Sequence, residues 1–146
     1  MKKAVKQVLG TIEEIDFPEA NLFGVKAKVD TGARTSSIDV KQIKVIKRDD
    51  AYVLTCRLID KKHPVLEFSD FATREVKSSN GSVESRYVVK LTVMLYGKKY
   101  KSEFTLANRK SMTYPVLLGK RLLNGRFLVD VSQKNLSSQF MKEQQK

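Results

Sequence analysis

An alternation of apolar and polar residues with a period of two is the feature that most restricts what this chain can fold into. Val25, Ala27 and Val29 are interleaved with Lys26 and Lys28, which indicates a strand with one solvated face. Further runs typical of strands lie at 43–46, 52–59, 64–68, 87–96, 100–106, 116–118 and 127–131. The pattern predicts a small all-β barrel or a pair of packed sheets.

Short turn sequences separate these strands. Gly97-Lys98-Lys99 joins the runs 87–96 and 100–106 as the clearest hairpin, and Asp49-Asp50 marks another turn. Asn80-Gly81 lies in the polar stretch 72–86 and predicts an exposed hairpin, although a floppy loop fits the same residues. Residues 120–124, closed by Gly125, have room for one or two turns of helix.

The length of 146 residues suits a single domain. We expect residues 1–131 to form it and residues 132–146, rich in Ser, Gln and Lys, to be a polar tail that frays or forms a loose helix. No apolar run approaches the roughly 20 residues needed to cross a bilayer. The N-terminal stretch lacks the apolar segment of a signal peptide, and Cys56 has no second cysteine to pair with. A cytoplasmic protein without membrane attachment is expected.

The charge balance points to an acidic partner. The chain has 28 basic and 16 acidic residues and a net charge of +12. Such an excess favours a polyanionic or acidic ligand. The basic residues are dispersed, and aromatic residues are not interleaved with them as in a nucleic-acid stacking surface. Nucleic acid is therefore not the expected partner, and a merely solvated basic surface fits the composition equally well.

Several kinds of catalytic site lack the residues they need. One histidine, His63, and one cysteine cannot supply a zinc site of nitrogen and sulfur ligands, so no metal is expected. A Ser-His-Asp triad would have to use the same His63, with no nucleophile motif around any serine. Gly119-Lys120-Arg121 lacks the remaining residues of a phosphate-binding loop. We therefore expect no cofactor.

Carboxylate chemistry remains, and Asp30-Thr31-Gly32-Ala33 is its candidate. The apolar strand 25–29 delivers Asp30 into a turn, where Gly32 lets the backbone come close to the carboxylate. The hydroxyl of Thr31 can brace the loop. Alone, the motif fits an ordinary strand-ending turn equally well.

A second element makes the motif specific. Residues 112–123, MTYPVLLGKRLL, contain a short apolar strand, Leu117-Leu118-Gly119 and the start of a helix. With both motifs in this order, the chain resembles the retropepsin-like aspartic peptidases over about residues 15–131. The closest resemblance is to a bacterial branch often labelled "ATP-dependent zinc protease". The resemblance implies the closed β-barrel of the acid protease fold, with one short helix after the late glycine.

The resemblance also implies an active site shared between two copies of the chain. In retropepsin-like proteins each chain supplies one Asp-Thr-Gly loop, and no other aspartate here is followed by Thr-Gly or Ser-Gly. The expectation is a homodimer in which both copies of Asp30 are catalytic and Thr31, Gly32 and Ala33 complete the active-site loop. The polar hairpin would be the flap, with Ser78, Ser79, Asn80 and Gly81 at its tip.

Two cations depart from the viral pattern. Viral retropepsins follow Asp-Thr-Gly-Ala with an acidic residue that pairs with an arginine after the late glycine. Arg34 and Lys120 stand at those positions here. Arg34, with Lys120 or Arg121, is therefore a candidate for binding an acidic substrate group. An internal partner for Arg34, such as Glu67 or Glu75, is the alternative.

These features together predict an aspartic peptidase that cleaves an acidic or glutamate-rich peptide. Members of the bacterial branch are associated with ATP-grasp ligases that add glutamate, so association with such a ligase is implied by analogy. The alternative is a non-catalytic basic β-barrel module that binds RNA or an acidic protein.

Overall fold

The alternating segments form a ring of strands, as expected from the sequence. The computed structural model describes residues 5–77, 80–107 and 113–145. Its main strands are β2 (Ile12–Phe17), β3 (Leu22–Val29), β4 (Ser36–Arg48), β5 (Ala51–Leu58), β8 (Val83–Leu95) and β9 (Lys98–Ala107). The shorter elements are β1 (Gln7–Leu9), η1 (Pro18–Ala20), β6 (Leu66–Phe68), β7 (Ala72–Lys77), β10 (Val116–Leu118), α1 (Lys120–Leu123), β11 (Phe127–Val129) and α2 (Leu136–Gln144).

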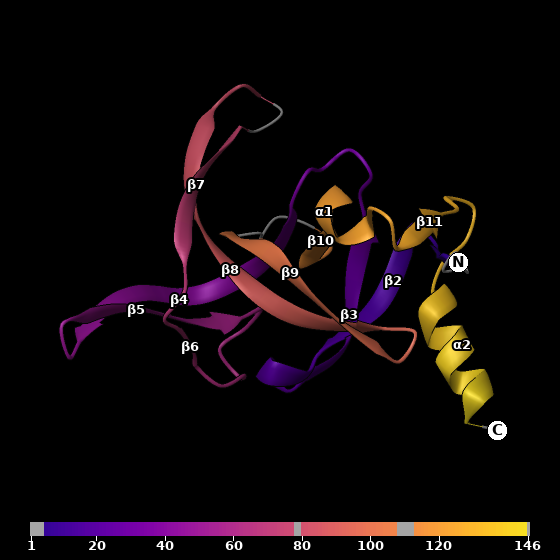
Figure 1. Cartoon of the computed structure of the whole chain (residues 1–146), viewed down its shortest axis with the longest axis horizontal. Coiled ribbons are helices and arrows are strands. Elements are labelled where there is room, and N and C mark those ends of the chain that lie inside the picture. The colour runs from indigo at the N-terminus through magenta and orange to yellow at the C-terminus, as the bar shows by residue number, and fades with distance from the viewer. Residues whose placement is uncertain (1–4, 78–79, 108–112, 146) are drawn as a thin grey trace, which may run out of the picture.

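The ring closes through β10. Strands β3, β2, β8, β9 and β4 follow one another in the sheet, and β10 pairs with β3 in parallel and with β4 antiparallel. Closure leaves fewer unpaired strand edges than an open sheet would. The predicted all-β, retropepsin-like barrel with one short helix after the late glycine is confirmed (Figure 1).

The barrel interior is apolar. Phe17 and Phe104 meet edge to face with ring centroids 5.7 Å apart, and both rings are fully buried. The inward residues of β3 are those predicted from the alternation, with Val25, Ala27 and Val29 buried. Burying a side chain of the size of valine or larger stabilises the folded protein by about 1.5–3 kcal/mol relative to leaving it exposed.

Two hairpin turns are made by residues in the left-handed backbone conformation. Tyr96 and Gly97 connect β8 to β9 and both have positive φ, at 55° and 72°. Asp49 and Asp50 connect β4 to β5 with φ of 51° and 64°. Positive φ at both central residues matches the twist of paired strands. The β8–β9 turn therefore begins one residue before the predicted Gly97-Lys98-Lys99, because Tyr96 adopts the left-handed conformation.

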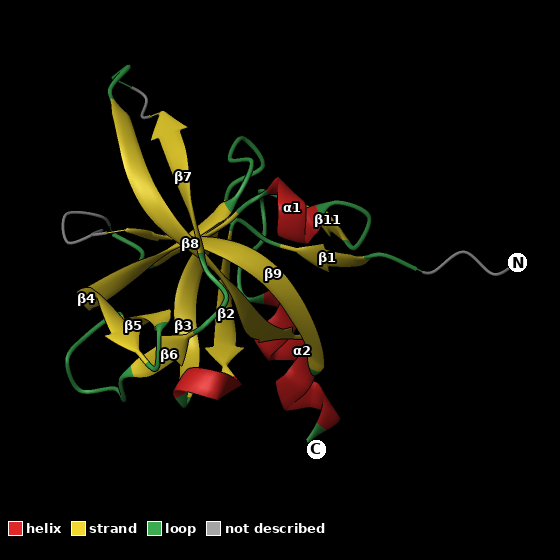
Figure 2. Ribbon diagram, turned by 60° about the vertical axis from the view of Figure 1, so that its left-hand side comes forward, coloured by secondary structure: helices red, strands yellow, loops and turns green. Residues whose placement is uncertain are grey.

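Residues 132–144 pack on the barrel. The buried carboxylate of Glu13 accepts hydrogen bonds from the backbone N–H groups of Gly10 at 2.6 Å, Leu136 at 3.2 Å and Ser137 at 3.0 Å. Ser137 Oγ in turn accepts from the N–H of Tyr96 at 2.8 Å. These bonds hold the start of α2 against the barrel (Figure 2).

Two long hairpins extend away from the barrel. In Figure 1 the β7–β8 hairpin projects at the upper left and the β4–β5 hairpin at the lower left. On the opposite side, β1 and β11 form a parallel two-stranded sheet near α1 (Figure 2). Over the described residues, no helix has both the length and the apolar character needed to cross a bilayer.

Candidate active site

The loop that carries Asp30, predicted to be the active-site loop, begins where β3 meets β10. Val29 pairs with Leu118 in the parallel register, and the N–H of Asp30 donates to the carbonyl of Leu118 at 2.9 Å. The N–H of Val29 donates to the carbonyl of Thr11 on the other side at 2.9 Å. Asp30 is thus delivered by a strand end that is hydrogen-bonded on both sides, and such rigid support favours a precisely placed functional group.

The loop folds back on the Asp30 carboxylate. The N–H of Gly32 donates to Asp30 Oδ1 at 2.9 Å, and the N–H of Ala33 donates to the carbonyl of Asp30 at 3.2 Å. A Cβ atom on Gly32 would lie 3.2 Å from the same Oδ1, closer than an ordinary contact. Asp30 is half-buried, while Thr31 and Gly32 are exposed. The loop therefore presents its carboxylate at the surface of one chain.

The late glycine packs directly beneath this loop. The N–H of Gly119 donates to the buried Ser36 Oγ at 3.0 Å, and the N–H of Lys120 donates to the carbonyl of Ala33 at 2.8 Å. A Cβ atom on Gly119 would lie 2.7 Å from the Thr35 carbonyl carbon and 2.9 Å from the Ala33 oxygen. Only glycine fits at this contact. Leu117, Leu118 and Gly119 are thus brought against the Asp30 loop.

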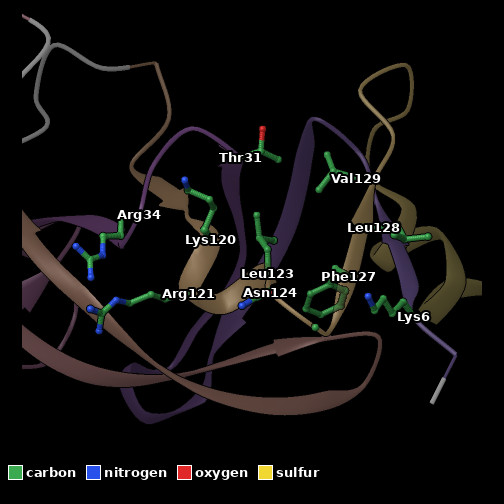
Figure 3. A pocket seen from close by; sticks show the side chains of 11 residues that line it. Lys6, Thr31, Arg34, Lys120, Arg121, Leu123, Asn124, Phe127, Leu128 and Val129 are labelled. Carbon is green, nitrogen blue, oxygen red and sulfur yellow. The ribbon is translucent and has the colours of Figure 1, made fainter. Parts of the chain in front are cut away.

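A pocket of about 680 Å³ adjoins the loop on the side of Thr31. Arg34, Lys120 and Arg121 lie at one end of it and Lys6 at the other (Figure 3). Apolar side chains line the space between, including Leu123, Phe127, Leu128 and Val129. Asp30 is not among the lining residues. The pocket suits a ligand with anionic ends and an apolar or extended middle.

The candidate binding cations differ in their pairing. Arg121 Nη1 lies 3.2 Å from Glu103 Oε1, so this guanidinium already has an internal acid. The side chains of Arg34 and Lys120 are both exposed. Within the described ranges, neither forms a hydrogen bond or an ion pair. Glu67 pairs with Arg48 at 2.6 Å, and among the described residues Glu75 forms no ion pair with Arg34, so neither acid is the internal partner considered for Arg34.

Glu103 is a residue that sequence reasoning missed. Its Oε2 accepts from Arg74 Nη2 at 2.7 Å while its Oε1 faces Arg121. The hydrogen bond from Arg74 lowers the pKa of the Glu103 carboxyl, burial opposes this, and the charges of Arg74, Arg121 and Lys90 lower it further. Glu103 is the single acid in the strand 98–107, which is the only local pattern that could have drawn attention to it. Its partners lie 18 and 29 residues away in sequence, so no local pattern indicates the pairing.

The predicted flap coincides with the β7–β8 hairpin. Ser78 and Ser79 lie outside the described residues. Asn80 Oδ1 accepts from the N–H of Ser82 at 3.1 Å, and Gly81 has a φ of 88°. Strand pairing runs from Ala72 with Val88 to Lys77 with Val83.

In the described part of the chain, no three His, Cys, Asp or Glu side chains lie close enough together to hold a metal ion. His63 lies 3.5 Å from Asp60 in the turn after β5.

Comparison with known proteins places this geometry in a family. Residues 8–139 match the model of the RimB-like family, described as retropepsin-like aspartic endopeptidase RimB. A crystal structure of a protein of unknown function from Legionella pneumophila superposes with a TM-score of 0.75 at 26% identity, covering 91% of this chain and 99% of that one.

Curated relatives carry a different description. A protein from Shewanella halifaxensis named "Probable alpha-L-glutamate ligase" is 36% identical over 137 residues, covering 88% of this chain and 29% of the relative. One of the same name from Desulfotalea psychrophila is 30% identical over 158 residues, covering 95% of this chain and 33% of the relative. The chain thus spans about a third of the length of the curated relatives it matches.

The matched region 8–139 contains the Asp-Thr-Gly loop, β10 inserted between β3 and β4, and the helix after the late glycine. It extends into α2, beyond the predicted domain end at residue 131. The chain belongs to the RimB-like family of retropepsin-like aspartic endopeptidases.

Proposed function

We propose that the protein is an aspartic peptidase whose active site is completed by a second copy of the chain. The observation that carries the proposal is the Asp30 loop, held by Leu118 and Gly119 with its carboxylate at the surface. The Asp-Thr-Gly sequence occurs once in the chain, so a pair of such loops requires two chains. In the homodimer the two Asp30 carboxylates face each other.

The chemistry follows from the coupled ionisation of this pair. Two carboxylates about 3 Å apart cannot both ionise cheaply, so the pair shares one proton. The ionised carboxylate takes a proton from a water molecule, whose oxygen attacks the amide carbonyl carbon. The protonated carboxyl hydrogen-bonds the carbonyl oxygen and then protonates the nitrogen as the C–N bond breaks. The pair titrates as a unit rather than as two separate residues.

The substrate in this proposal is an acidic, glutamate-rich peptide. Arg34 and Lys120 are exposed cations that lack an internal acid within the described residues, and both line the pocket beside Thr31. An acid of the protein paired with Arg34 would compete with a substrate carboxylate, and within the described residues Arg34 has no such partner. The net charge of +12 adds a long-range attraction for the same ligands.

Association with a glutamate ligase is the proposed biological setting. The relatives named alpha-L-glutamate ligases are about three times as long as the region that matches this chain. A domain of this kind is therefore joined to the remainder of a ligase in those proteins. A hydrolase for glutamate-rich peptides would act on the class of product that such a ligase makes.

The β7–β8 hairpin is proposed as the flap over this site. It projects from the barrel on the same upper side as the loop between β3 and β4 (Figure 1). A closed flap would exclude water from the peptide and hold it across the two Asp30 carboxylates.

The test compares Asp30→Asn with Asp49→Asn, a matched change at the exposed β4–β5 turn. Cleavage of a synthetic peptide ending in a run of glutamates is followed by mass spectrometry, and dimerisation by light scattering. We expect Asp30→Asn to lose hydrolysis while remaining dimeric, and Asp49→Asn to keep both. A binding module would instead show no hydrolysis in any form and equal, salt-sensitive binding by both variants.

A further inference from the structure

The β7–β8 hairpin has few connections to the barrel. In the described part of the chain, β7 pairs with no strand other than β8. A two-stranded hairpin alone is marginally stable, and here only β8 continues into the barrel, where its residues from Val88 onward pair with β9. Any side chain that ties β7 to the barrel therefore has a disproportionate effect on where the hairpin lies.

Arg74 is such a side chain. It lies in the middle of β7, and its guanidinium donates to Glu103 Oε2 on β9 at 2.7 Å. Its other terminal nitrogen reaches Thr35 Oγ1 at 3.5 Å, at the end of the active-site loop. One guanidinium of the hairpin thus contacts both the barrel wall and the loop that follows Asp30.

Glu103 connects this contact to the late glycine. Its second oxygen, Oε1, lies 3.2 Å from Arg121 Nη1 on α1, next to Gly119 and Lys120. Lys90, its cross-strand neighbour on β8, adds a further positive charge. The carboxylate therefore lies among cations from β7, β8 and α1, and it offsets their mutual repulsion.

We infer that Glu103 is a positioning residue that fixes the base of the β7–β8 hairpin relative to the active-site loop, by holding Arg74 and Arg121 with one carboxylate. The inference deepens the proposed function, because it assigns the anchor of the flap. Glu103 touches no reacting atom. It acts through Arg74 and Thr35 on one side and through Arg121 on the other.

Charge and position can be separated with two variants. Glu103→Gln and Arg74→Gln each break the anchor, but the first raises the net charge by one and the second lowers it by one. If the anchor sets the hairpin position, both variants raise KM for the glutamate peptide by about threefold to tenfold and leave kcat within about twofold. The effect of the double variant on KM is smaller than the two single effects combined, because both substitutions remove the same Arg74–Glu103 contact.

The matched control is Glu84→Gln. Glu84 pairs with Arg86 at 3.2 Å within β8, on the same hairpin, and among the described residues no hydrogen bond or ion pair joins these two side chains to the barrel. We expect its KM to be unchanged. If KM changes in opposite directions in Glu103→Gln and Arg74→Gln, Glu103 acts only through its charge. If KM rises as much in Glu84→Gln as in Glu103→Gln, the effect is not specific to Glu103. Either result would overturn the inference.

A second readout does not depend on hydrolysis. Amide hydrogen exchange in β7 and in the first half of β8 should become faster in both anchor variants, while β2 and β3 stay protected. Unchanged exchange in the hairpin overturns the anchor even if the wild-type protein hydrolyses peptides. Faster exchange with no hydrolysis by the wild type would support the anchor and reject the proposed function.

Discussion

The N–H of Asp30 donates to the carbonyl of Leu118 at 2.9 Å, so the two sequence motifs of this chain meet at a single hydrogen bond. The bond extends the parallel pairing of β3 with β10 by one residue into the Asp30 loop. Because β10 also pairs with β4, both strands that flank the loop are held by the same short strand. The position of Asp30 therefore depends on the packing of residues 116–119.

Gly119→Ala tests that dependence. The backbone of Gly119 is in a region open to alanine, so the cost comes only from the new Cβ meeting Thr35 and Ala33 within 2.9 Å. We expect the free energy of unfolding to fall by about 3 kcal/mol, as for severe overpacking. Urea denaturation measures it.

Gly125→Ala is the matched control for this substitution. Its φ is 78°, and a Cβ there meets no atom within 4 Å. Its cost is the left-handed conformation alone, about 1 kcal/mol. Equal losses at Gly119 and Gly125 would contradict the close contact beneath the loop.

Arg34→Glu tests the substrate class. The variant places a negative charge in the pocket where the substrate carboxylate is proposed to bind. We expect kcat/KM to fall by about tenfold or more for a glutamate-rich peptide and to change little for a neutral peptide. Lys47→Glu, on an exposed part of β4, carries the same charge change and should affect the two peptides equally. Equal cleavage of both peptides by Arg34→Glu would exclude a role for Arg34 in selecting acidic substrates.

The ion pairs of Glu103 should stabilise the protein only over a limited pH range. The hydrogen bond from Arg74 is the main reason that the Glu103 pKa lies below its ordinary value of 4.5, and Arg121 and Lys90 act in the same direction. A lowered carboxyl pKa stabilises the folded protein above the unfolded pKa, and this contribution is lost as the pH falls through the folded value.

We therefore expect the wild type to be slightly more stable than Glu103→Gln at pH 7, by less than about 1 kcal/mol because the groups are partly exposed. The difference should persist down to about pH 5 and disappear below the folded pKa. Urea denaturation of both proteins across this range measures it. A difference that grows as the pH falls would contradict the assignment.

Glu13 supports the packing of α2. Its side chain is fully buried and accepts three backbone N–H groups, from Gly10, Leu136 and Ser137. Glu13→Ala leaves these donors without an acceptor, so we expect a loss of about 3 kcal/mol or more in the free energy of unfolding. Glu14→Ala, one residue along and on the other face of β2, should cost little. Similar losses for the two variants would contradict the role given to Glu13.

The strands and both motifs of the site could be predicted from sequence because each is a local pattern. Alternation placed Val25, Ala27 and Val29 inside, and Gly119 before the helix marked the second motif. Glu13 is in phase with the buried Ile15 and Phe17, so its burial was also readable from the period of two. The period does not indicate how the buried carboxylate is satisfied, because its hydrogen-bond donors come from residues 10, 136 and 137.

The contacts of Glu103 could not be predicted in the same way. They depend on barrel closure, which brings β7, β9 and α1 together from distant parts of the sequence. The alternative of Glu67 as a partner for Arg34 was wrong for the same reason, because Glu67 pairs with Arg48 across the β4–β5–β6 sheet. Side-chain pairing across a closed barrel follows from register, which local patterns do not specify.

The central claim is that two copies of Asp30 build one active site, and subunit mixing tests it most directly. Wild-type protein is equilibrated with about a tenfold excess of Asp30→Asn, and hydrolysis of the glutamate peptide is measured at fixed wild-type concentration. If the site is shared, most wild-type chains pair with the variant and the rate falls to about one tenth. An unchanged rate would show that each chain carries a complete site and would contradict the account.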